Sequence, residues 1–268
     1  MFTVMSLSVA AAHARDPDLS TLVASTVRAS VNLAVLVALR ATDPWSLFGD
    51  RRPALLTRGV LGGLSLLTYF GALSVIGVGE AAFLNQTSAV WVAALAPLVL
   101  GERTPRLVWV AVTGSMIGVA LLAEPRSGDA VGRALALGSG LFAAGAYLSI
   151  RRAGETNSPV VIVFYFTLIA TLLAGTLVLI TGAPAPKDAA TLGWLAMSGL
   201  AATGGQLIMT LAYRLGKAGP IAAAGATGAL LHALGGWALF GQVPDARAAV
   251  GMAILLVSGV ALPLIAAR

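Results

Sequence analysis

The side chains of this sequence that could do chemistry are few, and most of them sit singly within long apolar runs. Cysteine is absent, which excludes disulfides, thiolate metal sites and cysteine nucleophiles, and histidine occurs only as His13 and His232. The sequence has no metal-ligand motif and no glycine-rich loop of the phosphate-binding kind. We therefore expect no metal, no cofactor and no enzymatic activity.

Arg28 carries a permanent charge inside an apolar run, where a charged side chain is costly and marks a candidate functional site. It lies about eight residues from one end of its predicted helix, or roughly 12 Å deep. None of the 11 acidic residues falls at that depth. Its partner must therefore be a backbone carbonyl, Glu80 at the rim, or an anionic group of a ligand. A structural arginine that binds neighbouring helix ends is the alternative.

Another apolar run contains a turn of polar residues: Asn85, Gln86, Thr87 and Ser88. Two adjacent amides exceed what helix packing in lipid normally needs, so this turn is predicted to line a water-filled cavity. Trp91 shares the face of Thr87 and either stacks on a ligand or packs against a neighbouring helix. Together with Arg28, these amides could recognise a carboxylate, a phosphate or an imide edge. Simple hydrogen bonding to an adjacent helix is the alternative for the amides.

Further polar side chains could complete such a site: Tyr147, Tyr165, Gln206 and His232. The first three belong to the inner halves of their predicted spans and could line an inward-facing cavity. His232 lies at a depth similar to that of Arg28 and could accept a proton, because histidine titrates nearest neutral pH. A histidine that simply bonds one backbone carbonyl is the alternative.

The elements that must position these residues are membrane-spanning helices. The chain of 268 residues is 58% hydrophobic and 10% charged, with a mean hydropathy of +0.90, whereas soluble domains carry roughly 25% charged residues. Apolar runs of nearly twenty residues recur, and each can cross roughly 30 Å of hydrocarbon. We predict ten spans, at about 1–13, 20–41, 54–76, 80–100, 106–123, 131–150, 158–181, 189–213, 219–240 and 248–266.

Orientation follows from the basic residues, since cytoplasmic loops retain an excess of Lys and Arg. One set of alternate loops and the C-terminal tail hold 11 of the 17 basic residues: Arg40, Arg51, Arg52, Arg58, Arg103, Arg106, Arg151, Arg152, Arg214, Lys217 and Arg268. The other set holds 5: Arg15, Arg126, Arg133, Lys187 and Arg247. Both termini are therefore predicted to be cytoplasmic in a bacterial inner membrane. The net charge of +6 does not indicate nucleic acid, because the basic residues form no stripe.

The first predicted span is short, with about twelve apolar residues where roughly twenty are needed. We expect additional residues before Met1 in the native protein. A cleaved signal peptide is the less favoured interpretation, because no basic region precedes the apolar stretch.

An internal repeat appears when the chain is shifted by 140 residues against itself, which places 69–103 over 209–243 without a gap. The shift matches seven residue pairs: Ala72 with Ala212, Gly79 with Gly219, Ala82 with Ala222, Thr87 with Thr227, Ala89 with Ala229, Ala93 with Ala233, and Gly101 with Gly241. A separation of five spans is odd, so the second copy enters the membrane from the opposite side. Such inverted repeats are typical of secondary carriers.

These motifs are similar to those of EamA-type carriers of the drug/metabolite transporter superfamily. The resemblance rests on the segments Tyr69–Leu73, Glu80–Ser88 and Leu100–Arg103, on their counterparts from Ala212 to Pro244, and on Arg28, Asn157–Pro159 and Phe164–Phe166. Ala89 and Ala229 depart from the family pattern, which usually has proline there, and Gln242 replaces a common glutamate. The resemblance implies a ten-helix carrier that works by alternating access, and it leaves the substrate open.

The sequence therefore predicts an all-α polytopic membrane protein of two inverted five-helix repeats, residues 1–124 and 131–267. The substrate cavity is expected between them, bordered by the third, fourth, eighth and ninth spans. The expected partners are a small-molecule substrate and the lipid bilayer, with no nucleic acid, as a monomer or a homodimer. Export of a small polar or amphipathic metabolite is favoured.

The alternatives are an uptake carrier for a nucleoside-like or vitamin-like substrate, and a non-transporting structural membrane subunit. A cation-extruding drug exporter would need a membrane-embedded carboxylate, and the sequence places none at mid-span. A membrane enzyme would need a cluster of titratable groups at one depth, which only Arg28 and His232 approach.

Overall fold

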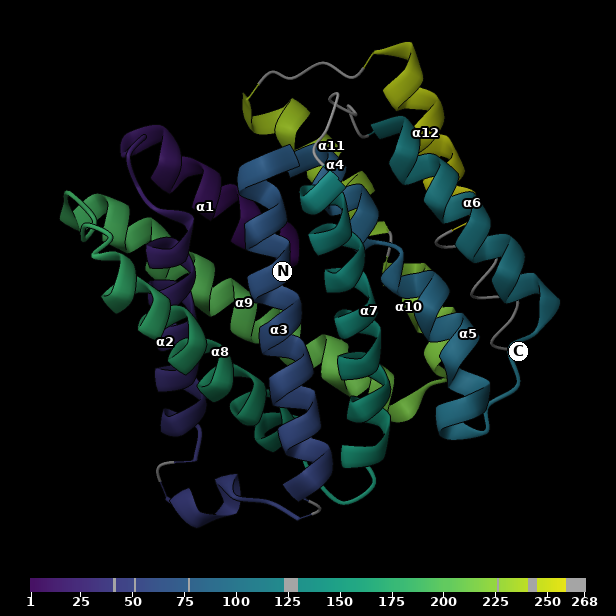
Figure 1. The fold of residues 1–268 in the computed structure, drawn as a ribbon, viewed down its shortest axis with the longest axis horizontal. Helices are drawn as coiled ribbons and strands as arrows, with labels where there is room; N and C mark the ends of the chain where they lie inside the picture. Colours follow the sequence, from purple (N-terminus) through teal and green to yellow (C-terminus); the bar gives the residue numbers. More distant parts are fainter. Residues whose placement is uncertain are drawn as a thin grey trace.

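A computed structural model describes residues 1–40, 42–50, 52–76, 78–122, 130–225, 227–240 and 245–258. In these residues the regular structure is helical, with no strand (Figure 1). The α-helices are α1 (Phe2–Arg15), α2 (Thr21–Ala38), α3 (Arg52–Ile76), α4 (Val78–Asn85), α5 (Ser88–Leu100), α6 (Arg106–Leu122), α7 (Ala130–Ala153), α8 (Pro159–Thr181), α9 (Ala189–Leu215), α10 (Ala218–Gly225), α11 (Thr227–Phe240) and α12 (Ala246–Leu256). The short 3-10 helix η1 (Pro44–Leu47) lies between α2 and α3.

Six segments of the described chain are long and apolar enough to cross a membrane: Thr21–Ala38, Arg52–Ala72, Glu80–Leu100, Ala130–Ala153, Pro159–Thr181 and Ala189–Leu215. They coincide with six of the predicted spans. The other four correspond to shorter helices, namely α1, α6, the pair α10 and α11, and α12. A polytopic membrane protein is thus confirmed, while the number ten stays a prediction.

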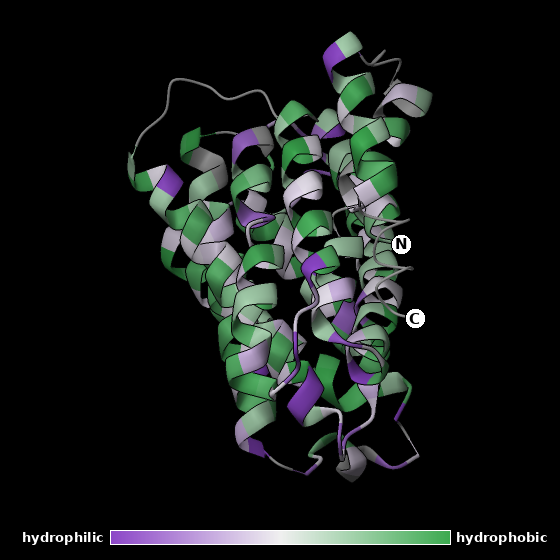
Figure 2. Cartoon of the chain, turned by 90° about the vertical axis from the view of Figure 1, so that its right-hand side faces the viewer, coloured by the Kyte–Doolittle hydropathy of each residue, from purple (hydrophilic) through white to green (hydrophobic). Residues whose placement is uncertain are grey.

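Most residues along the helices are hydrophobic, and several hydrophilic residues lie at the two ends of the bundle (Figure 2). Leu98 and Leu179 are 82% and 84% exposed. Such exposure across many helices is unfavourable in water but matches a lipid environment, where polar groups face the bundle interior.

The fourth predicted span is interrupted at Gln86 and Thr87, between α4 and α5. In the ninth predicted span α10 ends at Gly225 and α11 begins at Thr227, and the residue between them lies outside the described residues. At both positions a threonine hydroxyl donates to the carbonyl three residues earlier: Thr87 Oγ1 to Leu84 O at 2.6 Å, and Thr227 Oγ1 to Ala224 O at 2.7 Å. These threonines are paired by the shift of 140 residues, so each side chain stabilises the equivalent turn.

Gly140 allows α7 to approach the interruption of the helix at Gln86 and Thr87 closely. A Cβ atom at Gly140 would lie 2.6 Å from Thr87 Oγ1 and 3.0 Å from Asn85 O. Any larger residue would push the α4–α5 turn away from α7, because close backbone approach in membranes depends on small residues.

The helices pack in a pattern that pairs distant parts of the chain. The helix α3 packs along α7 and α8, α1 packs on α9, α2 packs on α8 and α9, and α6 packs on α12. In Figure 1, α1, α2, α8 and α9 lie together on the left, next to α3. This arrangement encloses polar side chains of α2, α3, α8 and α9.

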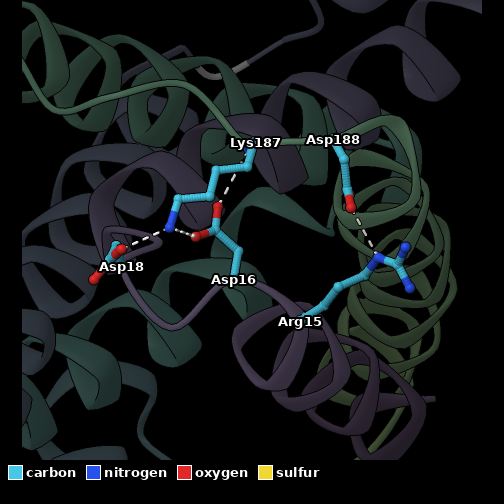
Figure 3. Close-up of polar contacts among 5 residues, drawn as sticks. All are labelled: Arg15, Asp16, Asp18, Lys187 and Asp188. Atoms are coloured by element: carbon cyan, nitrogen blue, oxygen red, sulfur yellow. Dashed lines mark hydrogen bonds and ion pairs between the residues drawn. The ribbon is translucent and has the colours of Figure 1, made fainter.

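A cluster of charged residues at one end of the bundle ties the α1–α2 turn to the start of α9 (Figure 3). We call it the outer cluster, and the network at the opposite end the inner network, after the membrane sides that the sequence predicts for them. The outer cluster consists of Arg15, Asp16, Asp18, Lys187 and Asp188. Arg15 Nε lies 2.9 Å from Asp188 Oδ2, and Lys187 Nζ lies 2.6 Å from Asp18 Oδ2 and 3.2 Å from Asp16 Oδ1. Asp188 is also the N-cap of α9, and its Oδ1 accepts from the backbone N–H of Thr191 at 2.6 Å. That bond and the Arg15 contact lower the pKa of Asp188 to about 2.

An inner network joins the other ends of α5, α7, α9 and α10. We define it as Glu102, Arg151, Gly154, Arg214 and Ala218. Glu102 Oε1 accepts from Arg151 Nε at 3.1 Å, and Glu102 Oε2 accepts from the backbone N–H of Ala218 at 3.0 Å. Arg151 also donates to the carbonyl of Arg214, and Arg214 Nε donates to the carbonyl of Gly154 at 2.8 Å. One carboxylate thus connects three separate chain segments.

Candidate functional site

Arg58, on α3, is buried inside the bundle with only 2% of its surface exposed. Its Nη2 donates to Gln206 Oε1 on α9 at 3.2 Å. Its guanidinium lies 4.2 Å from the centroid of the Phe166 ring on α8, a cation–π contact. A Cβ atom at position 62 would collide with Nη1 of Arg58, so Gly62 provides the space for this side chain.

A cavity of about 50 Å³ lies beside this contact, between α2, α3, α8 and α9. Its lining residues are Arg28, Ala29, Asn32, Leu66, Phe166, Thr167, Ala170, Ala202 and Gln206. One water needs roughly 10–15 Å³ of such volume. The cavity therefore has room for a few water molecules or for one small polar group.

Several polar atoms at the cavity have no protein partner. Asn32 Oδ1, Thr167 Oγ1 and Arg58 Nε are buried and make no hydrogen bond within the described structure. Arg28 Nη1 reaches only Met5 Sδ, at 3.1 Å, and a thioether is a weak acceptor. Unpartnered buried polar atoms are costly and each needs an explanation. Water or the polar group of a ligand would satisfy them.

Arg28 lines this cavity, and the guanidinium of Arg58 lies next to it, in contact with the lining residues Gln206 and Phe166. No carboxylate of the described residues pairs with either arginine. The ion pairs between described residues instead join helix ends, as in the outer cluster, in Arg151–Glu102 and in Arg133–Glu80, the last at 2.6 Å between α7 and α4. The cavity is thus a site of positive charge within the membrane-spanning part.

Two tyrosines continue the polar cluster beyond Arg58. Tyr147 on α7 and Tyr213 on α9 stack with ring centroids 5.0 Å apart and an interplanar angle of 13°. Both lie close enough to Arg58 for electrostatic interaction. Of the predicted site residues, Arg28 and Gln206 line the cavity and Tyr147 lies in this adjacent stack.

The other predicted site residues lie elsewhere. Asn85 Nδ2 donates to Ser139 Oγ on α7 at 2.7 Å, and Gln86 is half-buried at the α4–α5 break. Trp91 is 39% exposed, and Tyr165 Oη donates to the carbonyl of Phe48 at 2.9 Å. His232 belongs to α11, but its side chain lies outside the described part of the structure.

The predicted layer of Arg28, Asn85 and Gln86 is therefore not joined by any hydrogen bond among the described residues. The cavity is bordered by α2, α3, α8 and α9, whereas the sequence pointed to α3, α4 with α5, α9, and α10 with α11. Two of the expected helices, α3 and α9, are shared. A substrate-binding role for the predicted residues stays a prediction.

Sequence reasoning missed Arg58, Asn32, Phe166 and Thr167. Arg58 was assigned to a cytoplasmic loop, although it falls four residues inside the span predicted at 54–76. The structure corrects this assignment, because Arg58 is buried in α3 against α8 and α9. Its position within an apolar run was the signal that could have found it. Among the described residues no group of three or more His, Asp or Glu could hold a metal ion.

Comparisons with known proteins identify the family of this chain. A sequence model described as the EamA-like transporter family matches residues 1–123 and 130–263. The pseudopaline exporter CntI of Pseudomonas aeruginosa is 33% identical over 212 residues, which cover 78% of this chain and 74% of the exporter. The riboflavin transporter of Rhizobium johnstonii is 28% identical over 223 residues, which cover 82% of this chain and 70% of the transporter.

A solved crystal structure matches the chain with a TM-score of 0.81 at 16% sequence identity. The match covers 100% of this chain and 96% of the solved one. At this identity the likeness shows a shared fold.

Proposed function

The chain belongs to the EamA-like transporter family, and we propose that it carries a small polar or amphipathic metabolite across a bacterial inner membrane. It acts as a secondary active transporter by alternating access, in the direction of export. The observation that carries this proposal is the cavity between α2, α3, α8 and α9, which Arg28, Asn32, Thr167 and Gln206 help to line, with its unpartnered polar atoms. A purely structural membrane subunit has no need of such a cavity.

The proposed architecture is two inverted five-helix repeats, residues 1–124 and 131–267. The packing supports it, because the pair α1 with α9 is the repeat equivalent of the pair α7 with α3. The pairs α2 with α8 and α6 with α12 each join equivalent helices of the two halves. The hydroxyl bonds of Thr87 and Thr227 add a local match. In carriers of this kind the site lies at the interface between the repeats.

Export is proposed because the relative matched at 33% identity is named as an exporter. The relative named as a riboflavin transporter supports uptake of a vitamin-like substrate as the second candidate. Both termini are proposed to be cytoplasmic, from the distribution of basic residues.

The test is transport of a labelled metabolite panel into inside-out and right-side-out vesicles. The panel includes carboxylates, phosphates, amines, nucleosides and vitamins, with and without an ionophore that dissipates the ion gradients. Gradient-dependent accumulation in inside-out vesicles alone supports export. Accumulation only in right-side-out vesicles replaces export by uptake, and no movement of any compound at normal insertion overturns the proposal.

The chain offers a matched pair of variants for this assay. Thr167→Val removes a hydroxyl from the cavity wall without changing its size, whereas Thr171→Val makes the same change one helical turn further along α8, outside the cavity lining. We expect Thr167→Val to raise KM by roughly three- to tenfold, because one hydrogen bond to the substrate is lost. Thr171→Val leaves KM unchanged. Equal effects of the two variants would place the transport site elsewhere.

A further inference from the structure

We propose that the cavity selects a small organic anion, whose carboxylate or phosphate group binds between the guanidinium groups of Arg28 and Arg58. This inference rests on the proposed transport function and names the substrate class of the same site. It rests on charge, on the supply of free donors and on the rigidity of Arg58.

The charge argument begins from the cost of placing two guanidinium groups inside the bilayer. A buried cation is retained when it is paired, when it coordinates an anion, or when it serves function. Arg28 and Arg58 find no carboxylate among the residues that the structure describes, and their side chains donate to the neutral Met5 and Gln206. An anionic group is attracted by both guanidinium groups: a carboxylate offsets one of the two positive charges, and a dianionic phosphate offsets both. A neutral ligand leaves them uncompensated, and a cationic ligand is repelled.

The supply of donors points to the same class of ligand. A guanidinium carries five N–H donors and no acceptor. Arg58 donates from Nη2 to Gln206, while its Nε has no hydrogen-bond partner among the described residues. Arg28 donates one N–H to the thioether sulfur of Met5. Carboxylates and phosphates accept several such donors in a planar, often bidentate arrangement.

The position of Arg58 is fixed before any ligand arrives. Phe166 lies 4.2 Å below the guanidinium, Gly62 leaves space beside Nη1, and Gln206 holds Nη2. A guanidinium plane stacked on an aromatic ring loses little further freedom when it binds an anion. Arg28, by contrast, is half-buried with one weak contact, so it is the arginine free to adjust to the ligand.

The experiment compares two probes of equal shape on the full-length protein in nanodiscs of phosphatidylcholine. Acetate carries the charge, acetamide lacks it, and inorganic phosphate is the second anion. Chloride keeps the ionic strength constant. Binding is followed as the rise of Tm with probe concentration, which gives an apparent Kd. We expect acetate or phosphate to raise Tm saturably and acetamide to have no such effect. The stronger of the two anions tells whether the substrate group is a carboxylate or a phosphate.

The variants Arg28→Gln and Arg58→Gln each weaken anion binding roughly tenfold or more, because a charge-assisted hydrogen bond is lost. Arg58→Lys keeps the charge and retains part of the response, which separates recognition from a folding defect. Arg106→Gln is the matched control, since Arg106 is exposed at the start of α6. The inference would be overturned if neither acetate nor phosphate raised the Tm of the native sequence more than acetamide does, or if anion binding survived in both glutamine variants.

The vesicle panel separates the two proposals. Transport of neutral or cationic compounds without anion binding would refute the anion site and leave the transporter standing. Anion binding that depends on both arginines, without transport of any anion, would support the site and contradict the transport function.

Discussion

The inner network and the outer cluster close the bundle at opposite ends by different physical means. In the inner network the Glu102 side chain is 17% exposed. Glu102 accepts from the backbone N–H of Ala218, and Arg151 donates to the backbone carbonyl of Arg214. In the outer cluster Arg15 and Asp188 are 53% and 44% exposed, and Lys187 and Asp18 are 59% and 79% exposed. Asp16 is the buried exception.

This difference affects how firmly each end is held. An exposed ion pair contributes little, because water and salt screen it and two long side chains lose freedom. A half-buried carboxylate that accepts from an arginine and from a backbone N–H leaves unpaired groups behind when either partner is lost. We therefore expect the inner network to contribute more to stability than the outer cluster. In a transporter the more weakly held end is the one that opens at lower cost.

The largest effect expected in this comparison follows from Arg151→Met. The change removes the donors to Glu102 and to the carbonyl of Arg214. We expect a loss of about 2–3 kcal/mol in unfolding free energy, because a half-buried carboxylate loses its charged partner. Thermal or denaturant unfolding in nanodiscs measures it.

Arg152→Met is the matched control for that prediction. Arg152 is the next residue in the chain and is exposed, and its Nη2 donates to the carbonyl of Val99. We expect Arg152→Met to lower the unfolding free energy clearly less than Arg151→Met does. If Arg152→Met proved equally destabilising, the bonds of the inner network would contribute no more to stability than an exposed contact does.

A smaller effect is expected for Glu102→Gln. The amide oxygen can still accept from the backbone N–H of Ala218, while the charge that attracts Arg151 is lost. We expect a loss of about 1 kcal/mol, the scale of one hydrogen bond weakened from charged to neutral. The same unfolding assay applies, together with Glu102→Leu, which removes both bonds and should cost more. A Glu102→Leu variant with an unchanged unfolding free energy would show that this end of the bundle is stabilised by apolar packing alone.

Much of this fold could be predicted from hydropathy, because a bilayer dictates the length and composition of its helices. Six predicted spans coincide with long apolar helices of the structure. The turn at Asn85 to Ser88 was recognised as polar, but the interruption of the helix at Gln86 and Thr87 and its close approach to Gly140 of α7 were not predicted. Contacts of this kind join distant parts of the chain, and a local pattern does not contain them.

The candidate site could be predicted only in part for the same reason. Arg28 was found because it stands alone in an apolar run. Arg58 was missed because Arg51 and Arg52 precede it closely, so it was counted with them among the cytoplasmic loop charges. Its proximity to Phe166 and Gln206 arises from the packing of α3 on α8 and from the reach of α9. Counting charges treats all basic residues near a helix end alike, whereas the structure distinguishes the buried Arg58 from the arginines of the loops.

The smallest effect concerns the outer cluster and depends on pH. Asp188 has a pKa of about 2 in the folded protein, below its ordinary value of 3.8, first because it accepts from the backbone N–H of Thr191 and then because Arg15 donates to it. A lowered folded pKa means that the charged form stabilises the fold above the unfolded pKa, and that this contribution is lost as the pH falls through the folded value. Asp188→Asn keeps an acceptor for the α9 N-terminus and removes the charge. The difference in Tm between the native sequence and Asp188→Asn should therefore be constant from about pH 7 to pH 5 and shrink between about pH 4 and pH 2. Raising the salt concentration should reduce the part due to Arg15, because exposed pairs are screened. A difference that stays constant down to about pH 2 would mean that the carboxylate charge does not stabilise this end of the bundle, and that the outer cluster acts through its neutral hydrogen bonds alone.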